Sequence, residues 1–323
     1  MGRQRKRKGR GGGARWGLRA LIAAGAAALG IAGVMCRPER WLEGLEGTEP
    51  AGPPSPAPAP TSSRGSRPKG QAPRAPAPSV HLELGTPARK GGGGGDDDRR
   101  MIKPEYALSY HRGRNVASWV SWQLDASYFG DAPRHRGRFL ADDTLPEGFY
   151  RVTHDDYTGS GFDRGHMVRS EERTRSPEDN RTTFLLTNIL PQQHDLNAGP
   201  WLRLEEHCQD LAQREGRTLF VVAGGVFGAR PKTIGKDVAV PEAFFKIAVV
   251  LDKGQGADDV GPGTRVIAVV MPNQAGLLDQ GWGGYRTTVD EVERRAGYDF
   301  LTAVPEATQQ AIEGRVDDGP TSR

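Results

Sequence analysis

Cysteine is scarce in this chain, with only Cys36 and Cys208 among 323 residues. Cys36 lies in an uncharged apolar segment near the N-terminus, so the two thiols cannot build a disulfide framework within a folded body. Cys208 is therefore predicted to be a packed thiol. The sequence also has no C-x-x-C pair and no H-x-x-x-H pair, and this argues against a zinc site made from its histidines.

Excess positive charge is also missing from most of the chain. The first 40 residues carry ten Lys or Arg and one acid, whereas the remaining 283 residues carry 34 Lys or Arg and 39 acids. The formal net charge of +4 therefore comes from +9 in the N-terminal segment and −5 in the rest. Overall charge does not indicate a nucleic-acid-binding body, so any phosphate-binding groove must come from local arginines.

The N-terminus combines a basic leader, residues 1–19, with an uncharged apolar segment, residues 20–36. As a helix this segment would span about 25 Å, slightly less than the core of a bilayer. The pattern fits an export signal or an uncleaved membrane anchor, and an Arg-rich leader without acids also fits mitochondrial targeting. We expect the folded domain to be exported, secreted or membrane-anchored outside the cytoplasm, with a mitochondrial location as the alternative.

Residues 37–100 are rich in Pro, Gly and Ala. Such a composition has too few bulky apolar groups to offset the entropy lost on ordering, which predicts a disordered spacer. The short patch "HLEL" within it is interpreted as too small to change that. The ordered domain is expected over residues 101–305, followed by a polar, flexible tail over residues 306–323.

Apolar and aromatic segments within residues 101–305 predict both strands and helices. Alternation in "YALSYH" and "ASWVSWQL" is typical of strands, and "RTLFVVAGGVF", "AFFKIAVVL" and "TRVIAVVMP" are typical of buried strands. Helices are predicted over residues 200–215 and 288–297, the second with Thr288 as N-cap and Gly297 as stop. The sequence therefore predicts an α+β domain with mainly antiparallel strands.

The stretch "YTGSGFDRGHM", residues 157–167, places Asp163, Arg164 and His166 behind two glycines. Glycine allows a backbone to approach a ligand closely. An imidazole can accept a proton from water at neutral pH, an arginine can bind phosphate, and an aspartate can orient a neighbouring group. By itself the stretch fits either a solvated charge cluster or a site that holds a phosphate beside a proton acceptor.

Oxygen-bearing side chains follow downstream, at Asn188, Gln192, Asn197 and Glu205. Mg²⁺ prefers oxygen ligands and keeps several of its waters. Pro200 is tolerated only in the first turn of a helix, so Asn197 is expected just before the helix. Its amide oxygen is suited to bind a cation directly, and Glu205 is suited to hold water bound to that cation.

These motifs, together with "FLADD", "T-N-I-L-P-Q", "LN…W…LE" and "VPEAFFKIAVV", resemble the DNA/RNA non-specific endonuclease family. The family includes endonuclease G and secreted bacterial sugar-non-specific nucleases, and the resemblance covers residues 106–304. It implies a ββα-metal (His-Me finger) core on a mainly antiparallel central sheet. It also implies a metal-dependent endonuclease that cuts DNA and RNA with little sequence preference, through contacts to sugar and phosphate.

The resemblance implies a role for each residue of the motif. His166 would be the general base that activates water, Asn197 would bind a single Mg²⁺ or Mn²⁺ ion, and Glu205 would hold the ion's water shell. Asn188 and Gln192 would support the site.

Arginines would hold the substrate. Arg134 best matches the family arginine that clamps the scissile phosphate, but Arg136 and Arg138 in the same loop are alternatives for that role. Arg164 would contact a nearby phosphate, and Asp163 is expected to orient the hairpin.

One departure from the family pattern is Gln209, at a position where close relatives carry an arginine. Gln209 cannot make the phosphate contact expected of that arginine. This motivates an alternative, a membrane-tethered protein that binds nucleic acid without cleaving it. A nuclease neutralised by an inhibitor protein is a further hypothesis. The charged segment "RSEERTR", residues 169–175, is interpreted as a solvated loop that could contact nucleic acid. His194 and His207 are interpreted as surface or helix-face residues.

Overall fold

The computed structural model describes residues 77–91 and 97–321. The basic leader, the predicted signal or anchor and most of the predicted spacer lie outside these residues. No helix within the described ranges is long and apolar enough to cross a membrane.

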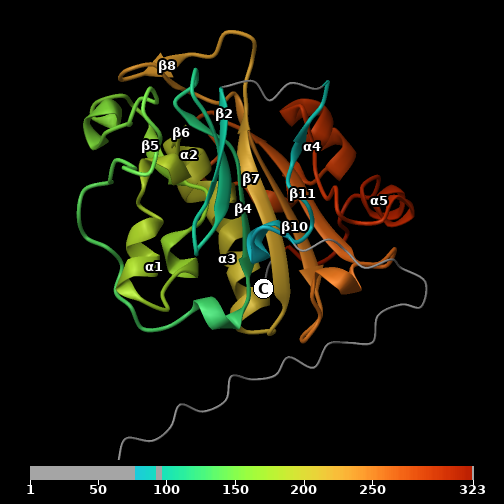
Figure 1. The fold of residues 1–323 in the computed structure, drawn as a ribbon. Helices are drawn as coiled ribbons and strands as arrows, with labels where there is room; N and C mark the ends of the chain where they lie inside the picture. The colour runs from blue at the N-terminus through green and yellow to red at the C-terminus, as the bar shows by residue number, and fades with distance from the viewer. Residues whose placement is uncertain (1–76, 92–96, 322–323) are drawn as a thin grey trace, which may run out of the picture. The chain divides into compact units, whose positions relative to one another are not determined.

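A six-stranded antiparallel sheet forms the centre of the domain (Figure 1). Its order is β11-β10-β7-β4-β3-β2. The strands are β2 (Asp98–Ile102), β3 (Ala107–His111), β4 (Val116–Leu124), β7 (Thr218–Val226), β10 (Ala243–Leu251) and β11 (Arg265–Pro272). Five of these strands coincide with the five apolar segments of the sequence, so the predicted mainly antiparallel α+β architecture is confirmed.

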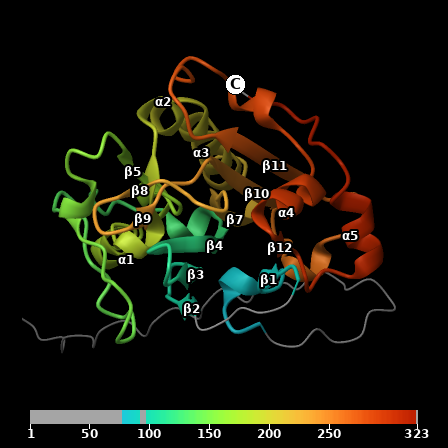
Figure 2. The ribbon, with the colours of Figure 1, turned by 90° about the horizontal axis from the view of Figure 1, so that it is seen from above.

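The sheet is covered on both faces, which explains why β7, β10 and β11 are almost entirely apolar. Successive residues of a strand point to opposite faces, so Phe244 packs in one core and Phe245 in the other. Trp122 and Trp119 of β4 are divided in the same way. Figures 1 and 2 show α1 and α3 on one side of the sheet and α4 and α5 on the other.

The first face carries a hairpin and three helices. The hairpin pairs β5 (Asp163–His166) with β6 (Ile189–Gln192), and the helices are α1 (Pro177–Thr182), α2 (His194–Leu196) and α3 (Leu202–Gln213). Leu204, Cys208 and Leu211 of α3 face this core at helical spacing. Cys208 is buried, as predicted, and burial raises its pKa to about 12. The hairpin followed by α3 forms the expected ββα unit.

A single wide turn, Asn197–Trp201, leads into α3. It is kinked at Gly199, where a Cβ atom would lie 3.0 Å from the Leu277 backbone oxygen. The predicted helix therefore begins at Leu202 and not at Pro200.

The second face carries α4 (Val289–Ala296) and α5 (Glu306–Ile312). The Thr288 hydroxyl accepts a hydrogen bond from the Glu291 amide (3.1 Å), and Gly297 ends α4 with a φ of 76°. Both predicted helix boundaries are confirmed.

Short elements connect these layers. Two-stranded pairs join β1 (Ala88–Arg89) to β12 (Tyr298–Asp299) and β8 (Thr233–Ile234) to β9 (Val238–Ala239). Single 3₁₀ turns occur at Val80–Leu82, Ala126–Tyr128, His154–Tyr157, Ser170–Glu172, Leu186–Asn188, Ala257–Asp259 and Trp282–Tyr285.

The predicted disordered spacer extends too far toward the C-terminus. The "HLEL" patch is folded, with Leu82 and Leu84 buried in the second core. His81 is bonded to the Pro104 oxygen (2.8 Å) and the Gln123 amide (3.1 Å). Average composition missed this because two leucines and one buried histidine are enough to anchor the segment.

The predicted flexible tail is also wrong for residues 306–321. Ile312 of α5 is buried, and the Asp317 carboxylate accepts a hydrogen bond from Arg265 Nε (2.7 Å). Burial of Ile312 and the ion pairs of Asp317 with Arg265 and Arg286 thus fix a segment whose composition is polar.

The segment "RSEERTR" differs most from its interpretation as a solvated loop. Arg173 is fully buried, and its guanidinium donates to the backbone oxygens of Glu105 (2.8 Å) and Gln123 (2.9 Å). The neighbouring Glu172 carboxylate accepts a hydrogen bond from Trp122 Nε1 (2.9 Å). Here charged side chains hold the loop against the sheet.

We expect Arg173→Met to lower the free energy of unfolding by about 3 kcal/mol or more, because it leaves the buried backbone oxygens of Glu105, Glu172 and Gln123 without their donor. Urea unfolding followed by circular dichroism measures this. The control is Arg175→Met, since Arg175 pairs with Asp179 at the surface and its side chain is 53% exposed. Its effect should stay within about 1 kcal/mol, and equal losses for the two variants would contradict the structural role of Arg173.

Candidate active site

His166 lies at the end of β5, opposite Ile189 of β6. Its partly buried ring packs against Phe139 (5.4 Å between centroids) and edge-on against Phe184 (5.0 Å). Its Nε2 is enclosed and has no hydrogen-bond partner among the described residues. The two aromatic rings therefore fix the imidazole and keep water from one side of it.

The surroundings of His166 favour the neutral imidazole. Burial is the main cause that lowers its pKa to about 3, since desolvation penalises the charged ring. Arg134 and Arg169 also lower this pKa, while Glu171 raises it. At neutral pH the ring is therefore a proton acceptor.

Asp163, at the other end of β5, holds Asn197. Its Oδ2 accepts hydrogen bonds from Asn197 Nδ2 (3.0 Å) and from the ring of His194 (2.9 Å). A carboxylate only accepts, so the nitrogen of the Asn197 amide must face Asp163 and its oxygen is directed elsewhere. Asp163 thus orients Asn197 through its side chain, and exposed His194, which was interpreted as a surface residue, is its second partner.

The buried side-chain amides of Asn188 and Gln192 stabilise the hairpin. Asn188 accepts from the Val168 amide (2.9 Å) and donates to the oxygens of Val168 (2.9 Å) and Thr183 (2.8 Å). Gln192 is opposite Asp163 in the register and packs so close to Gly165 that a Cβ there would lie 2.2 Å from its Oε1. Both amides support the backbone that carries His166.

Glu205 lies on α3 with only 5% of its surface exposed. It pairs with Lys246 Nζ (3.4 Å) and is 4.0 Å from Arg169 Nε. Burial raises its pKa to about 7, and the two cations oppose this shift. Lys246 is itself buried, with its ammonium 4.3 Å from the ring centroid of Trp201.

Of the three loop arginines, Arg134 is the one beside His166. Its guanidinium lies over Phe184 (5.0 Å), the ring that also contacts His166. Arg138 instead pairs with Asp155, and Arg136 is exposed without an ion pair to a described residue.

Arg164 is already engaged within the fold. Its Nη2 donates to the His154 oxygen (2.8 Å), and the guanidinium lies over Phe139 (5.7 Å) and Tyr157 (5.5 Å). These contacts stabilise the segment that precedes β5.

Glu171 and Arg169, which the sequence did not single out, connect Arg134 to Glu205. Arg134 Nη1 donates to Glu171 Oε1 (2.6 Å), and Arg169 Nε donates to Glu171 Oε2 (3.1 Å). Arg169 also donates to Gln209 Oε1 (3.0 Å) and lies near Glu205. No sequence signal marks the contacts of Arg134 with Glu171 and of Arg169 with Gln209, because these partners come from separate segments.

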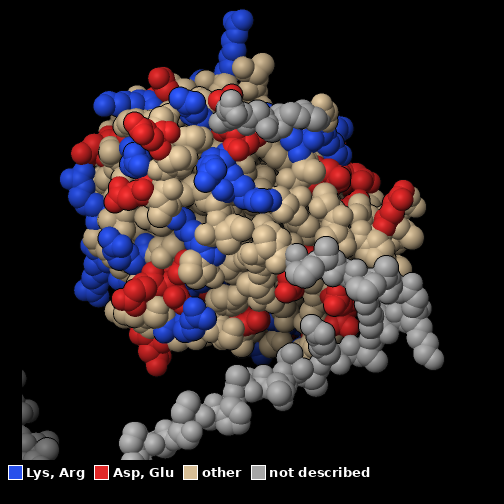
Figure 3. Space-filling view, in the orientation of Figure 1, with Lys and Arg blue, Asp and Glu red and all other residues tan. Residues whose placement is uncertain are grey.

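In Figure 3 Lys and Arg side chains gather at the left of the view, over the side of the domain where Figure 1 places α1 and β5. Acidic side chains lie among them. The body therefore offers local basic surface despite its overall negative charge, as expected.

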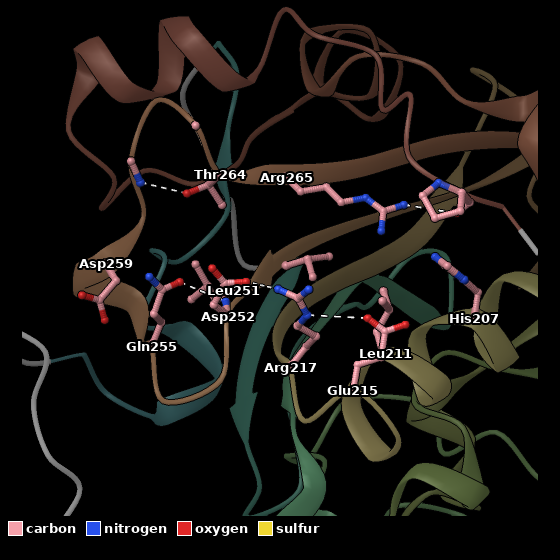
Figure 4. A pocket seen from close by; sticks show the side chains of 14 residues that line it. His207, Leu211, Glu215, Arg217, Leu251, Asp252, Gln255, Asp259, Thr264 and Arg265 are labelled. Atoms are coloured by element: carbon pink, nitrogen blue, oxygen red, sulfur yellow. Dashed lines mark hydrogen bonds and ion pairs between the residues drawn. The ribbon is translucent and has the colours of Figure 1, made fainter.

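A cavity of about 520 Å³ lies elsewhere, lined by residues of α3, β10 and β11 (Figure 4). His207 lines it, but His166 does not. Its arginines are neutralised, since Arg217 pairs with Asp252 and Arg265 pairs with Asp317. This cavity is therefore separate from the residues around His166.

Known proteins resemble both the sequence and the fold. The family described as DNA/RNA non-specific endonuclease matches residues 85–307. A nuclease of Nostoc sp. is 44% identical over 245 residues, which cover 75% of this chain and 88% of that protein. Human mitochondrial endonuclease G is 30% identical, with coverage of 62% and 68%. Human mitochondrial nuclease EXOG is also 30% identical, and the chain spans 55% of its length.

The crystal structure of an EndoG/EndoGI complex superposes with a TM-score of 0.59 at 26% identity, covering 72% of this chain and 96% of that one. This similarity confirms the α+β architecture with its ββα unit. The chain therefore belongs to the DNA/RNA non-specific endonuclease family and is an enzyme of that class.

Proposed function

We propose that this protein hydrolyses internal phosphodiester bonds of DNA and RNA with little sequence preference, using one divalent ion. The observation that carries the proposal is the geometry of β5. One end holds the neutral ring of His166 beside Arg134, and the other end holds Asp163, which orients Asn197.

His166 acts as the general base. The neutral imidazole takes a proton from the attacking water, and that water forms the new bond to phosphorus as the bond to the leaving oxygen breaks. Arg134 binds the scissile phosphate and stabilises its developing negative charge. Phe139 and Phe184 keep the ring of His166 oriented for this step.

The donor set fits a hydrated ion better than a protein cage. Across residues 77–91 and 97–321, no group of three or more His, Cys, Asp or Glu is arranged to hold a metal. Asn197 offers one amide oxygen, because Asp163 takes its nitrogen. Glu205 would accept hydrogen bonds from ion-bound water, and a nearby cation favours its charged form. Mg²⁺ or Mn²⁺ bound there would supply positive charge to the leaving oxygen.

The competing proposal is a tethered protein that binds nucleic acid without cleaving it. Gln209 motivated it, but the structure gives Gln209 a partner, the guanidinium of Arg169. A cation therefore still lies at that position. Binding without ion-stimulated cleavage would select this alternative.

The N-terminal segment supports proposals about location only. Export, secretion or membrane anchoring follows from residues 1–36, and mitochondrial entry is the alternative, since the endonuclease G and EXOG relatives are named as mitochondrial. An inhibitor protein is a further proposed partner, because the matched structure is an EndoG/EndoGI complex that concerns EndoG inhibition.

Both His166→Ala and Asn197→Ala should lower plasmid nicking at least about 100-fold, because they remove the base and the ion ligand. Raising the Mg²⁺ concentration should recover part of the Asn197→Ala loss by mass action but none of the His166→Ala loss. The control, His207→Ala, removes a histidine that lines the separate cavity and should leave nicking unchanged. Nicking that survives both site variants, or survives EDTA, would refute these roles.

The His166 ring should remain neutral from pH 8 down to pH 5 in the ion-free protein. A pKa lowered to about 3 means that the neutral form persists well below the ordinary midpoint near 6.5. Imidazole nitrogen chemical shifts measured by NMR across this range would show no titration of His166. A midpoint near pH 6.5 would mean that the ring is not desolvated as the structure has it.

A further inference from the structure

The carboxylate of Glu171 lies between two arginines beside His166. Its Oε1 accepts from Arg134 Nη1 (2.6 Å), and its Oε2 accepts from Arg169 Nε (3.1 Å) and from the Ser170 hydroxyl (2.9 Å). Arg134 and Glu171 are close enough to His166 to act on it in opposite directions. Two guanidiniums from separate segments thus converge on one anion next to the proposed base.

This arrangement has the chemistry of a phosphate site. A guanidinium binds the oxygens of carboxylates and phosphates with the same fork of N–H groups. Each oxygen of Glu171 takes one arginine, as the two non-bridging oxygens of a phosphodiester would. Arg134, the proposed clamp, is therefore already occupied by an anion of the protein itself.

Exposure suggests which partner moves when substrate arrives. The side chains of Glu171 and Arg134 are 37% and 51% exposed, so their ion pair opens onto solvent. Arg169 is only 17% exposed and is held from behind by Gln209 and Glu205. Glu171 can therefore swing away while Arg169 stays in place.

We propose that Glu171 is an internal stand-in for the substrate phosphate. It occupies Arg134 and Arg169 in the free enzyme, and a backbone phosphate displaces it and takes both guanidiniums. Arg169 is then a second phosphate-binding residue. The inference rests on the proposed function, because it takes the incoming anion to be the nucleic-acid backbone.

Glu171→Gln should tighten binding of a fluorescein-labelled DNA duplex, measured by anisotropy in EDTA so that no cleavage occurs. The dissociation constant should fall about three- to tenfold, since the two ion pairs of Glu171 no longer compete with the phosphate. In Mg²⁺, KM should fall, while kcat should stay within about twofold of its value for the unaltered enzyme.

Glu291→Gln is the matched control. Glu291 has the same exposure (36%) and an arginine partner, Arg294, but lies on α4 across the sheet. Glu291→Gln changes the net charge of the protein by the same amount as Glu171→Gln. The affinity for DNA should nevertheless change by no more than about twofold. In an Arg134→Gln background, the effect of Glu171→Gln should also shrink, because one competed guanidinium is gone.

Unchanged or weaker binding by Glu171→Gln would overturn the inference, and weaker binding would show that Glu171 supports Arg134. Cleavage by the unaltered enzyme, measured in parallel with Mg²⁺, separates the two proposals. Cleavage with no gain in affinity rejects only the stand-in, whereas a gain in affinity without any cleavage rejects only the nuclease function.

Discussion

The pairing of β5 with β6 is the constraint on which the site depends. Gly165 packs so tightly on Gln192 that no side chain fits between them, and this fixes the short strand against its partner. His166 is then set at one end and Asp163 at the other. Because both residues lie on one paired strand, the pairing fixes the separation between the proposed base and the residue that orients Asn197.

Charge is the second organising feature, because the site gathers cations within a body whose net charge is negative. Three of these cations have acidic partners, since Arg134 and Arg169 pair with Glu171 and Lys246 pairs with Glu205. Without such partners, the guanidiniums and ammonium would repel one another and be costly to desolvate. The same carboxylates limit how strongly the arginines depress the pKa of His166, since Glu171 opposes them.

The sequence predicted those features that depend on residues close together in the chain. Apolar runs revealed five sheet strands, a Thr and a Gly bounded α4, and the motif drew attention to His166 and Asn197. It failed where a few long-range contacts decide the outcome. Leu82 anchors a Pro-rich segment, and Asp317 anchors the polar tail through an arginine on β11. Charge alone also suggested solvation for residues 169–175, yet Arg173 is buried because three backbone oxygens accept its hydrogen bonds.

An anion held in the proposed phosphate site need not slow the chemistry. The need to displace Glu171 weakens the binding of the substrate and of the transition state equally. The effect therefore falls on substrate affinity and not on the rate at which the bound complex reacts. A long polyanion can tolerate this loss, because it contacts the protein through several phosphates at once. A short fragment has few other contacts, so competition by Glu171 disfavours it more. The carboxylate would therefore help cleaved ends to leave, while the guanidiniums stay paired and oriented between turnovers.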